Sequence, residues 1–329
     1  MKYKVTIQFS DFKPSKKRII ELSPKYNAIV ILGPTASGKT ALAVKIAEKL
    51  NTEILSIDSR QVYRGMDLGT GKDLDEYLLN DKRIPYHLID IVDAGGDYHL
   101  FRFQEDFQSA FSSVLVAGKI PILCGGSGLY LDAVLNNYQF SGIPINQPLR
   151  ESLIEKEIED LTKIFKQFTT PYSTLADVST KKRLIRAIEI SDYLSKNDYQ
   201  IHSEKIVKPI VIGLSLEINL RRKKISERLF KRIDTGMIEE VENLLKVGIP
   251  AEKLIFYGLE YKFITQYLTG LLSKQEMIDK LEIGIHQFAK RQMTFCRKME
   301  RNGLVINWLD ANLPQETLLQ QGLTILQNS

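Results

Sequence analysis

From Asn27 to about Val134, short apolar runs alternate with stretches whose apolar residues recur at helical spacing. The runs are rich in Ile, Leu and Val and are bounded by turn residues, as strands are. They predict strands at 28–33, 53–58, 86–92 and 120–125, with helices at 38–51 and 100–118. Strands and helices in this order build a parallel sheet with helices on both faces.

The alternation of strands and helices ends at YQFSGIPINQP, which begins at residue 138 and contains one glycine and two prolines. Residues 141–205 are charged, mostly of helical pattern and without a strand-like run, which predicts a helical insertion domain. KPIVIGLSLE, from residue 208, predicts a return to the sheet. Long helices follow, and LVINWLD, ending at residue 310, predicts a last strand at the sheet edge or closing the core.

We therefore predict an α/β chain with a core domain over 1–140 and 206–329 and an insertion over 141–205. Ahead of the core, KYKVTIQF and RIIEL, within residues 1–25, predict two short strands. With 43% hydrophobic residues, the chain can bury an ordinary core and lacks the composition of a disordered protein. No apolar run is long enough for a membrane span or a secretory signal, so we expect neither.

The cysteine count and the net charge bear on the cellular compartment and on the kinds of site and partner that the chain can have. Cys124 and Cys296 lie far apart and form no CxxC pair, which argues against a disulfide framework or a zinc site and fits a reducing cytoplasm. A net charge of +5 permits a nucleic-acid partner without requiring one. We see no coiled-coil pattern or exposed apolar seam, so a monomer is the expectation.

The stretch GPTASGKT fits the phosphate-loop pattern G-x-x-x-x-G-K-[ST] and has the required strand before it and helix after it. Its glycines allow backbone N–H groups to converge on an anion, and the helix start adds a positive end. We expect the lysine to reach a terminal phosphate and the Thr40 hydroxyl to hold Mg²⁺. The predicted diphosphate-binding residues are Gly33, Pro34, Thr35, Ala36, Ser37, Gly38, Lys39 and Thr40.

This loop predicts a P-loop NTPase-like, nucleotide-binding type of fold but leaves the reaction open. A kinase would bind ATP here and transfer a phosphoryl group. A prenyltransferase would bind an allylic diphosphate and release the diphosphate. The residues that choose between them must lie elsewhere in the chain.

Asp58 ends the second predicted strand, and in open parallel sheets ligands bind at the carboxyl ends of the strands. We therefore expect Asp58 beside the phosphate loop, although an aspartate that caps a turn is the alternative. Ser59, Arg60 and Gln61 add hydrogen-bonding groups of the kind that recognise nucleic acid. Asp90 ends the next predicted strand, where a Walker-B role in binding Mg²⁺ and an ordinary loop aspartate are both open.

Together these stretches resemble the bacterial tRNA dimethylallyltransferase (tRNA isopentenyltransferase) family. The resemblance runs in the family's order from about residue 28 to 308 and is carried by GPTASGKT, SIDSRQVYRGMDLGTGK, YHLIDI, PILCGGSGLYL, KKRLIRAIEI, RLFKRIDTGMIEEVENLL and FAKRQMTFCR. It implies transfer of the dimethylallyl group from dimethylallyl diphosphate to the N6 amine of the adenosine 3′ of the anticodon. The implied tRNAs are those that decode codons beginning with U, and the implied setting is tRNA modification in the cytoplasm, with Mg²⁺ as cofactor.

The resemblance also assigns catalytic roles. Asp58 matches the acid that orients the amine and takes its proton. Ser127 stands where the family usually has threonine, whose hydroxyl donates to the oxygen between the prenyl group and the diphosphate. Arg228 matches an arginine that contacts the leaving diphosphate; from helical spacing alone it could equally be a solvated charge, on the same face as Lys224 and Arg232.

The family's tRNA contacts, including the anticodon stem-loop, match four parts of this chain. They are Asp58, Ser59, Arg60 and Gln61; Arg150; Lys182, Arg183, Leu184, Ile185 and Arg186; and Tyr257, Gly258, Leu259, Glu260, Tyr261 and Lys262. The basic run at 182–186 predicts a phosphate-binding patch, with a solvated helix face as the alternative. The basic helix over FAKRQMTFCRK is a further candidate for the anticodon stem. Glu260 replaces a family glycine, and an acid there would repel phosphate unless paired.

Two other functions stay open. One is a small-molecule enzyme on the same scaffold, either a kinase or a prenyltransferase of free adenine nucleotides. The basic insertion argues against it, because a mononucleotide needs no such surface. The other is a non-catalytic RNA-binding protein, against which the intact Lys39, Thr40 and Asp58 argue.

Overall fold

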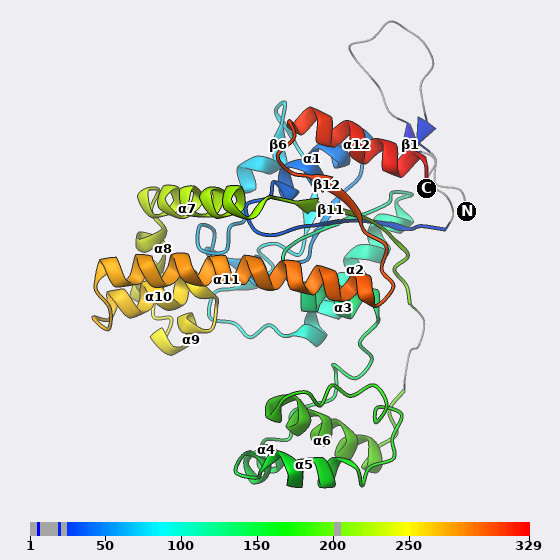
Figure 1. Ribbon diagram of the computed structural model, residues 1–329, viewed down its shortest axis with the longest axis vertical. Helices are drawn as coiled ribbons and strands as arrows, with labels where there is room; N and C mark the ends of the chain where they lie inside the picture. The colour runs from blue at the N-terminus through cyan, green and yellow to red at the C-terminus, as the bar shows by residue number, and fades with distance from the viewer. Residues whose placement is uncertain (1–4, 7–18, 21–24, 201–204) are drawn as a thin grey trace, which may run out of the picture. The chain divides into compact units, whose positions relative to one another are not determined.

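The structure, a computed structural model, describes residues 5–6, 19–20, 25–200 and 205–329. The chain divides into two compact units, coloured by residue number in Figure 1. The first unit comprises Met1–Leu135 and Ile206–Ser329, and the second comprises Asn136–Lys205. The second unit thus begins slightly before residue 141, the start predicted for the helical insertion.

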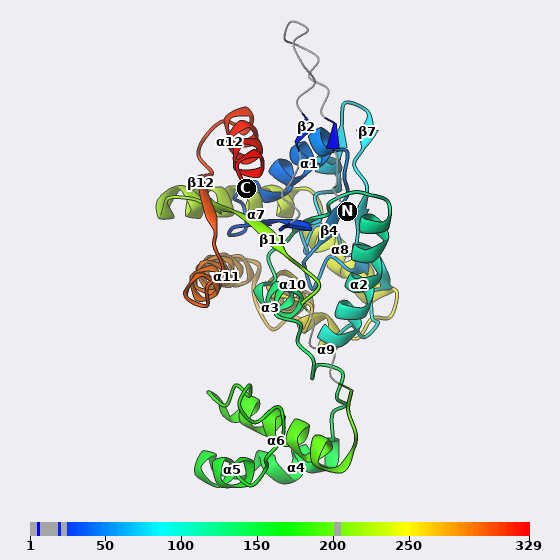
Figure 2. The same cartoon turned by 90° about the vertical axis from the view of Figure 1, so that its right-hand side faces the viewer.

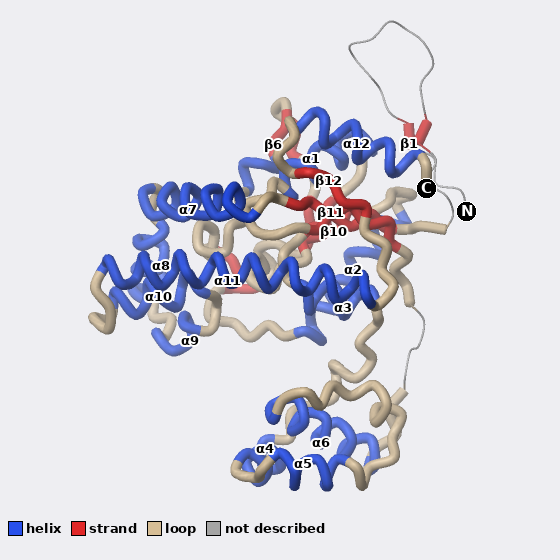
Figure 3. The backbone as a smooth tube through the Cα atoms, viewed as in Figure 1, coloured by secondary structure: helices blue, strands red, loops and turns tan. Residues whose placement is uncertain are grey.

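A six-stranded parallel sheet forms the centre of the first unit, with strand order β12-β11-β3-β10-β4-β8. The strands are β3 (Ala28–Leu32), β4 (Ile54–Ser56), β8 (Tyr86–His87), β10 (Ile122–Cys124), β11 (Pro209–Ser215) and β12 (Asn307–Asp310). Figure 3 shows these strands among the helices that surround them. The predicted parallel sheet is confirmed, and the last strand lies at its edge.

Three further pairings in the described residues involve very short strands. β1 (Val5–Thr6) pairs with β2 (Ile19–Ile20), and β6 (Leu78–Leu79) with β7 (Lys82–Arg83), both antiparallel. β5 (Tyr63–Arg64) pairs in parallel with β9 (Val92–Asp93). The two strands expected before residue 25 therefore exist in part, and the rest of KYKVTIQF and RIIEL lies outside the described residues.

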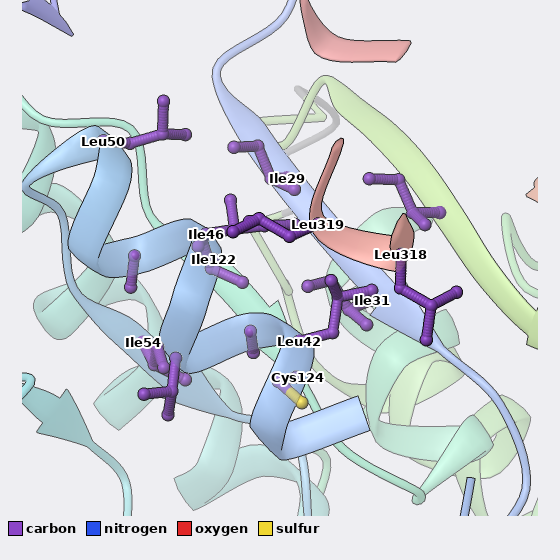
Figure 4. Packing of buried hydrophobic residues seen from close by; sticks show 14 of the residues in the cluster. Ile29, Ile31, Leu42, Ile46, Leu50, Ile54, Ile122, Cys124, Leu318 and Leu319 are labelled. Atoms are coloured by element: carbon purple, nitrogen blue, oxygen red, sulfur yellow. The ribbon is translucent and has the colours of Figure 1, made fainter. Parts of the chain in front are cut away.

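Alternate residues of β3 pack on opposite faces of the sheet, as the two-residue period of a strand requires. Ile29 and Ile31 pack with α1 (Lys39–Leu50) and α12 (Gln315–Gln327), and Figure 4 shows this cluster. Ala28, Val30 and Leu32 pack with α2 (Leu100–Val116) and α3 (Gly128–Leu135) on the other face. Figure 2 shows the two helical layers on either side of the strands. Each fully buried Ile or Val stabilises the fold by about 2 kcal/mol.

A second group of helices has its own apolar core beside the sheet. The helices are α7 (Ile218–Asp234), α8 (Met237–Lys246), α9 (Ala251–Ile255), α10 (Leu259–Leu268) and α11 (Lys274–Arg301). Ile225 and Leu229 of α7 and Leu281 and Ile285 of α11 are buried in this core. Helix α11 begins with a capping box between Ser273 and Glu276, which satisfies N–H groups of its first turn. Packing in this core holds α7, α10 and α11 beside the carboxyl ends of the central strands.

The described residues of the second unit form three helices, α4 (Gln147–Ile154), α5 (Ile158–Phe165) and α6 (Lys181–Lys196). Leu153, Leu161, Leu184 and Ile188 form its small apolar core. The predicted helical character of the insertion is therefore present. Among the described residues of either unit, no helix combines the length and the apolar character that crossing a bilayer requires.

Candidate active site

The carboxyl ends of the central strands open into a cavity of about 770 Å³ within the first unit. Its walls include the phosphate loop, residues 58–61, the glycine-rich turn after β10, one face of α7 and the start of α10. Lys39 and Asp58 line the same cavity, as their positions after β3 and β4 predict. The cavity therefore joins a candidate anion site to a carboxylate.

The phosphate loop adopts the conformation that its glycines make possible. Gly33 has φ +150°, and a side chain there would meet the carbonyl oxygen of Leu214 at 2.8 Å. Gly38, with φ +81°, precedes α1 and offers no capping side chain, so the first N–H groups of α1 are available to an anion. Lys39 Nζ donates to the carbonyl of Pro34 at 2.7 Å, and burial lowers the pKa of this lysine.

Gln292 of α11 holds the phosphate loop and the turn after β10 together. Its Oε1 accepts from the backbone N–H of Thr35 at 2.8 Å, and its Nε2 donates to the carbonyl of Gly126 at 3.0 Å. Only 9% of Gln292 is exposed, and both ends of its amide are used. No role was predicted for Gln292 from the sequence, although it lies inside the matched stretch FAKRQMTFCR.

The Ser127 hydroxyl lies against the loop that carries Asp58. The Ser59 N–H donates to Ser127 Oγ at 3.0 Å, and Ser127 Oγ donates to Ser59 Oγ at 3.2 Å. Gly125 packs on the backbone of Ile57 so closely that no Cβ would fit between them. The glycine-rich turn and the Asp58 loop are thus in direct contact, which fixes Ser127 in the cavity wall.

Asp58 faces the cavity, and its Oδ1 accepts from the backbone N–H of Arg60 at 2.9 Å. Burial raises the pKa of Asp58, while the Arg60 N–H and the charge of Lys39 oppose this shift. A raised pKa makes an ionised carboxylate a stronger proton acceptor than an ordinary aspartate. Burial likewise raises the pKa of Cys124 in the cavity wall to about 12, so this thiol stays protonated.

Arg228 reaches from α7 to the phosphate loop. Its Nη1 donates to Thr35 Oγ1 at 3.1 Å, and its Nη2 donates to Asp73. Lys224 and Arg232 line the same wall of the cavity, as helical spacing predicted. Arg228 is therefore positioned to contact an anion held by the phosphate loop rather than bulk solvent.

Arg60 and Gln61, predicted as tRNA contacts, line the cavity and also bond to the protein itself. Arg60 Nη2 donates to the carbonyl of Phe256 at 2.5 Å. Gln61 accepts from Ser56 Oγ at 2.8 Å and donates to the carbonyl of Gly71 at 3.1 Å. These hydrogen bonds fix the loop after β4. If Arg60 and Gln61 bind tRNA, they do so with side chains that the protein already holds in place.

The stretch 257–262 divides into cavity residues and buried supports. Gly258, Leu259, Glu260 and Lys262 line the cavity, and burial raises the pKa of Glu260. Tyr261 is fully buried, and its hydroxyl donates to Glu240 at 2.6 Å. The prediction of Tyr261 as a tRNA contact therefore needs correction, because its side chain has no surface for RNA.

Glu240, for which no role was predicted from the sequence, accepts four hydrogen bonds from the residues around it. Besides the Tyr261 hydroxyl, its carboxylate accepts from the backbone N–H groups of Asp67, Leu68 and Gly69, at 2.7 to 3.0 Å. Tyr257 has a similar supporting role, since its hydroxyl bonds to the backbone of Gly95 and Gly96. Tyr257 is 3% exposed, and what remains of its surface faces the cavity.

In the second unit, the predicted basic residues separate into two groups. Arg150 lies 2.6 Å from the buried carboxylate of Glu189, and Arg186 lies 3.6 Å from it. Arg186 also donates to two backbone carbonyls. Lys182 and Arg183 are exposed.

Leu184 and Ile185, which the resemblance grouped with these basic residues, are buried in the second unit. Their side chains pack with the apolar core of that unit and have no surface for tRNA, so this prediction is corrected. The exposed basic patch of α6 therefore reduces to Lys182 and Arg183.

Asp90, the candidate Walker-B acid, pairs instead with the buried ammonium of Lys72. Lys72 is 1% exposed and also donates to Asp67 and to the carbonyl of Tyr63, at 2.6 Å each. Asp90 does not line the cavity. These contacts give Asp90 a structural role and leave the Thr40 hydroxyl, which does line the cavity, as the candidate ligand of a metal ion.

Known proteins of similar sequence and fold belong to one family of tRNA-modifying transferases. The profile of the family described as IPP transferase matches residues 61–299, and that of isopentenyl transferase matches residues 26–95. A tRNA dimethylallyltransferase 2 of Bacteroides fragilis is 52% identical over 89% of this chain and 95% of its own length. One of Phocaeicola vulgatus is also 52% identical, over 92% and 98%.

Solved structures agree with this similarity. The full-length tRNA isopentenylpyrophosphate transferase of Bacillus halodurans superposes with a TM-score of 0.67 at 28% identity and covers 92% of this chain and 97% of its own. A tRNA isopentenylpyrophosphate transferase of Staphylococcus epidermidis gives 0.65 at 27% identity, over 92% and 99%. The similarity therefore extends over both units.

Proposed function

This chain belongs to the IPP transferase family, and we propose that it is a tRNA dimethylallyltransferase. It transfers the dimethylallyl group from dimethylallyl diphosphate to the N6 amine of the adenosine 3′ of the anticodon, in tRNAs that decode codons beginning with U. The observation that carries this proposal is the single cavity lined by both the phosphate loop and Asp58. A diphosphate at one end and an adenine at the other would face each other across a dimethylallyl group.

At the diphosphate end, the N–H groups at the start of α1 and the charges of Lys39 and Arg228 bind the substrate. Negative charge grows on the diphosphate as the bond between its oxygen and the allylic carbon breaks. Donors that are already fixed stabilise this charge without reorganising. Arg228 meets that requirement because its guanidinium is held by Thr35 and Asp73.

At the other end, Asp58 orients and deprotonates the adenine amine. This amine is a poor nucleophile because its lone pair is delocalised into the ring. Asp58 accepts a hydrogen bond from N6 and takes its proton as the bond from N6 to the allylic carbon forms. The electron pair of the breaking C–O bond passes to the diphosphate oxygen, toward which the Ser127 hydroxyl can donate.

The residues present fit a divalent cation such as Mg²⁺. Among the residues that the structure describes, no cluster of three His, Cys, Asp or Glu side chains offers a complete ligand set. Mg²⁺ is commonly held by one or two protein groups together with substrate phosphates and water, and the Thr40 hydroxyl suits that arrangement. Bound there, Mg²⁺ would neutralise charge on the diphosphate.

For tRNA, we propose that exposed basic residues bind the phosphates of the anticodon stem-loop. The candidates are Lys182 and Arg183 of α6 and Lys290, Arg291, Arg297 and Lys298 of α11, all of them exposed. Taking the target base out of its stack costs roughly a few kcal/mol, which such contacts offset. We further propose that the protein acts as a monomer and in the cytoplasm, where tRNAs decode codons.

The proposal is tested by incubating the protein with labelled dimethylallyl diphosphate, Mg²⁺ and tRNA that lacks the modification. We expect label in the tRNA, at the adenosine 3′ of the anticodon after nuclease digestion and mass spectrometry. The same tRNA with guanosine at that position, which has no N6 amine, should stay unlabelled. Asp58→Asn should abolish most labelling, whereas the matched control Asp75→Asn, at an exposed site outside the cavity, should not.

Parallel reactions separate the other functions. Label that enters AMP and not tRNA would indicate a prenyltransferase of free nucleotides. Hydrolysis or transfer of phosphate from ATP without prenylation would indicate a kinase. Binding of tRNA without any turnover would indicate an RNA-binding protein that has lost catalysis.

A further inference from the structure

One carboxylate, Asp73, lies between Arg228 and Arg232, the two arginines of α7 that line the cavity. Arg232 Nη2 donates to Asp73 Oδ1 at 2.9 Å and to Oδ2 at 3.1 Å. Arg228 Nη2 donates to the same Oδ2, while its Nη1 bonds to Thr35 of the phosphate loop. All four residues line the cavity. The guanidinium of Arg228 is thus held at one edge by the phosphate loop and at the other by Asp73.

The chain around Asp73 is shaped to receive both guanidinium groups. Gly71 has φ +67°, and a Cβ there would lie 2.5 Å from Arg232 Nη2 and 3.0 Å from Arg228 Nη2. No other residue type leaves this space. The next residue, Lys72, is fixed by its buried ion pairs, and Asp73 itself adopts a left-handed conformation with φ +45°. Among residues other than glycine, aspartate and asparagine adopt this conformation most readily, so aspartate suits this turn.

The charges of the cluster are consistent with a role for Asp73 in orienting the two guanidinium groups. Two neighbouring guanidinium groups repel each other, and without Asp73 they would move apart. Burial and the nearby Arg232 lower the pKa of Arg228. Although burial of Asp73 opposes the effect, the two arginines lower the pKa of its carboxyl. The carboxylate therefore stays ionised at neutral pH, and the three side chains Arg228, Arg232 and Asp73 together carry one net positive charge.

We propose that Asp73 and Arg232 are positioning residues for Arg228. Asp73 holds one edge of the Arg228 guanidinium so that the other edge points to the diphosphate, and Arg232 holds Asp73 in that position. This inference rests on the proposed function and deepens it, because it identifies what orients the donor for the leaving diphosphate. Neither Asp73 nor Arg232 contacts the reacting atoms in this scheme.

The two possible roles of Asp73 predict opposite effects of Asp73→Asn. If the wall acted only through its positive charge, removing the carboxylate would add a charge and speed the reaction. If Asp73 positions Arg228, the substitution slows the reaction. Asparagine is a suitable replacement because it matches aspartate in shape and tolerates the left-handed backbone, so the variant should fold.

The experiment measures kcat at saturating dimethylallyl diphosphate and tRNA in a double-mutant cycle. We expect Asp73→Asn to lower kcat about tenfold or more, which is part of the effect of losing one fixed donor. Arg232→Gln should act in the same direction, and Arg232→Lys, which keeps the charge, should lie in between. Asp75→Asn, in the short 3₁₀ helix (Leu74–Tyr77) that begins directly after Asp73, is the matched control and should leave kcat unchanged.

The decisive comparison is made in the Arg228→Gln background. There Asp73→Asn should change kcat less than about twofold, since residues that act through one group are not additive. An equal loss of kcat in both backgrounds would overturn the inference and indicate a structural role for Asp73. A rise in kcat for Asp73→Asn alone would also overturn it and would indicate that the wall acts only through its charge. If the wild-type protein itself fails to prenylate tRNA, the proposed function fails; if only the variants behave otherwise than predicted, this inference alone fails.

Discussion

Helices α7 and α6 carry similar basic patterns in the two units of the molecule, yet their charges have different surroundings. In α7, Arg228 faces an enclosed cavity, and its guanidinium is fixed by two partners. In α6, Lys182 and Arg183 face solvent, while Arg186 is held by Glu189 and by backbone carbonyls of its own unit. Basic residues at helical spacing thus line a cavity in one unit and face solvent or a buried carboxylate in the other.

Dielectric environment gives the physical reason for this difference. A charge interaction is several times stronger in a partly enclosed site than in water, where salt also screens it. We therefore expect fixed charges in the cavity to affect the rate of the chemical step. We expect exposed charges on α6 to affect how often and how tightly tRNA binds, and to do so less as salt rises. Substitutions in the two units should accordingly change different kinetic constants.

The largest effect is expected at Asp58. Asp58→Asn should lower kcat by about 10²- to 10⁴-fold, the usual contribution of a positioned general base, with little change in tRNA affinity. Single-turnover kinetics and filter binding with the same tRNA measure the two quantities. Comparable losses in both would assign Asp58 to binding and remove the distinction between the units.

The pH dependence of the same residue sharpens this prediction. Because burial raises the pKa of Asp58, kcat/KM should fall on the acid side at a pH above that of an ordinary aspartate. The same raised pKa also affects the stability of the fold. Ionising a carboxyl whose pKa is raised on folding lowers the free energy of unfolding, and it does so only above the unfolded pKa. Asp58→Asn should therefore unfold at a higher temperature than wild type near neutral pH, with the gain disappearing in acid.

Gln292 should give a smaller loss of rate. Gln292→Glu keeps the side-chain shape and the contact with the Thr35 N–H but replaces the donor to Gly126 with a second acceptor. Because this would separate the phosphate loop from the turn that carries Ser127, we expect kcat to fall by about tenfold, on the scale of a lost buried hydrogen bond. Gln287→Glu, on the exposed face of the same helix, is the matched control. If both variants retained full rate, the two loops would not depend on Gln292.

The positions of Lys39 and Asp58 follow from the sequence because they depend on local order along the chain. A strand, a glycine-framed loop and a helix place the lysine, and parallel topology places the carboxylate beside it. Gln292 and Asp73 were not predicted because they meet their partners across long separations in sequence, 257 residues for Gln292 and Thr35. For Tyr261, the motif could be matched, but whether its ring faces a cavity or a core depends on packing.

In the insertion, periodicity predicted helices but not the way their charges are used. Glu189 is buried within α6, and charged residues are rarely buried unless they are paired. Its partners Arg150 and Arg186 come from α4 and α6. Nothing in the spacing of these arginines distinguishes them from solvated charges, so the prediction grouped them with Lys182 and Arg183.

Glu189 provides a test inside the second unit that should leave the chemistry intact. Glu189→Gln removes a carboxylate that Arg150 and Arg186 share, and leaving buried polar groups short of a partner costs about 1–3 kcal/mol. We expect faster hydrogen exchange in α6 and a raised KM for tRNA at unchanged kcat. Glu155→Gln, at an exposed site in the same unit, should change neither. A loss of kcat comparable to that of the Gln292 variant would show that the two units are not separable in this way.

Lys182 should have the smallest effect and the most diagnostic salt dependence. Lys182→Ala removes one exposed charge, so tRNA affinity should fall only a few-fold at low salt, with kcat unchanged. The slope of log K against log salt should become shallower by about one unit if this lysine neutralises one phosphate. Lys163→Ala removes another exposed charge of the same unit, one already paired with Asp160, and is the matched control. Equal changes in slope for both variants would mean that tRNA responds to the net charge of the unit, whereas a change confined to Lys182 would locate the phosphate contact on α6.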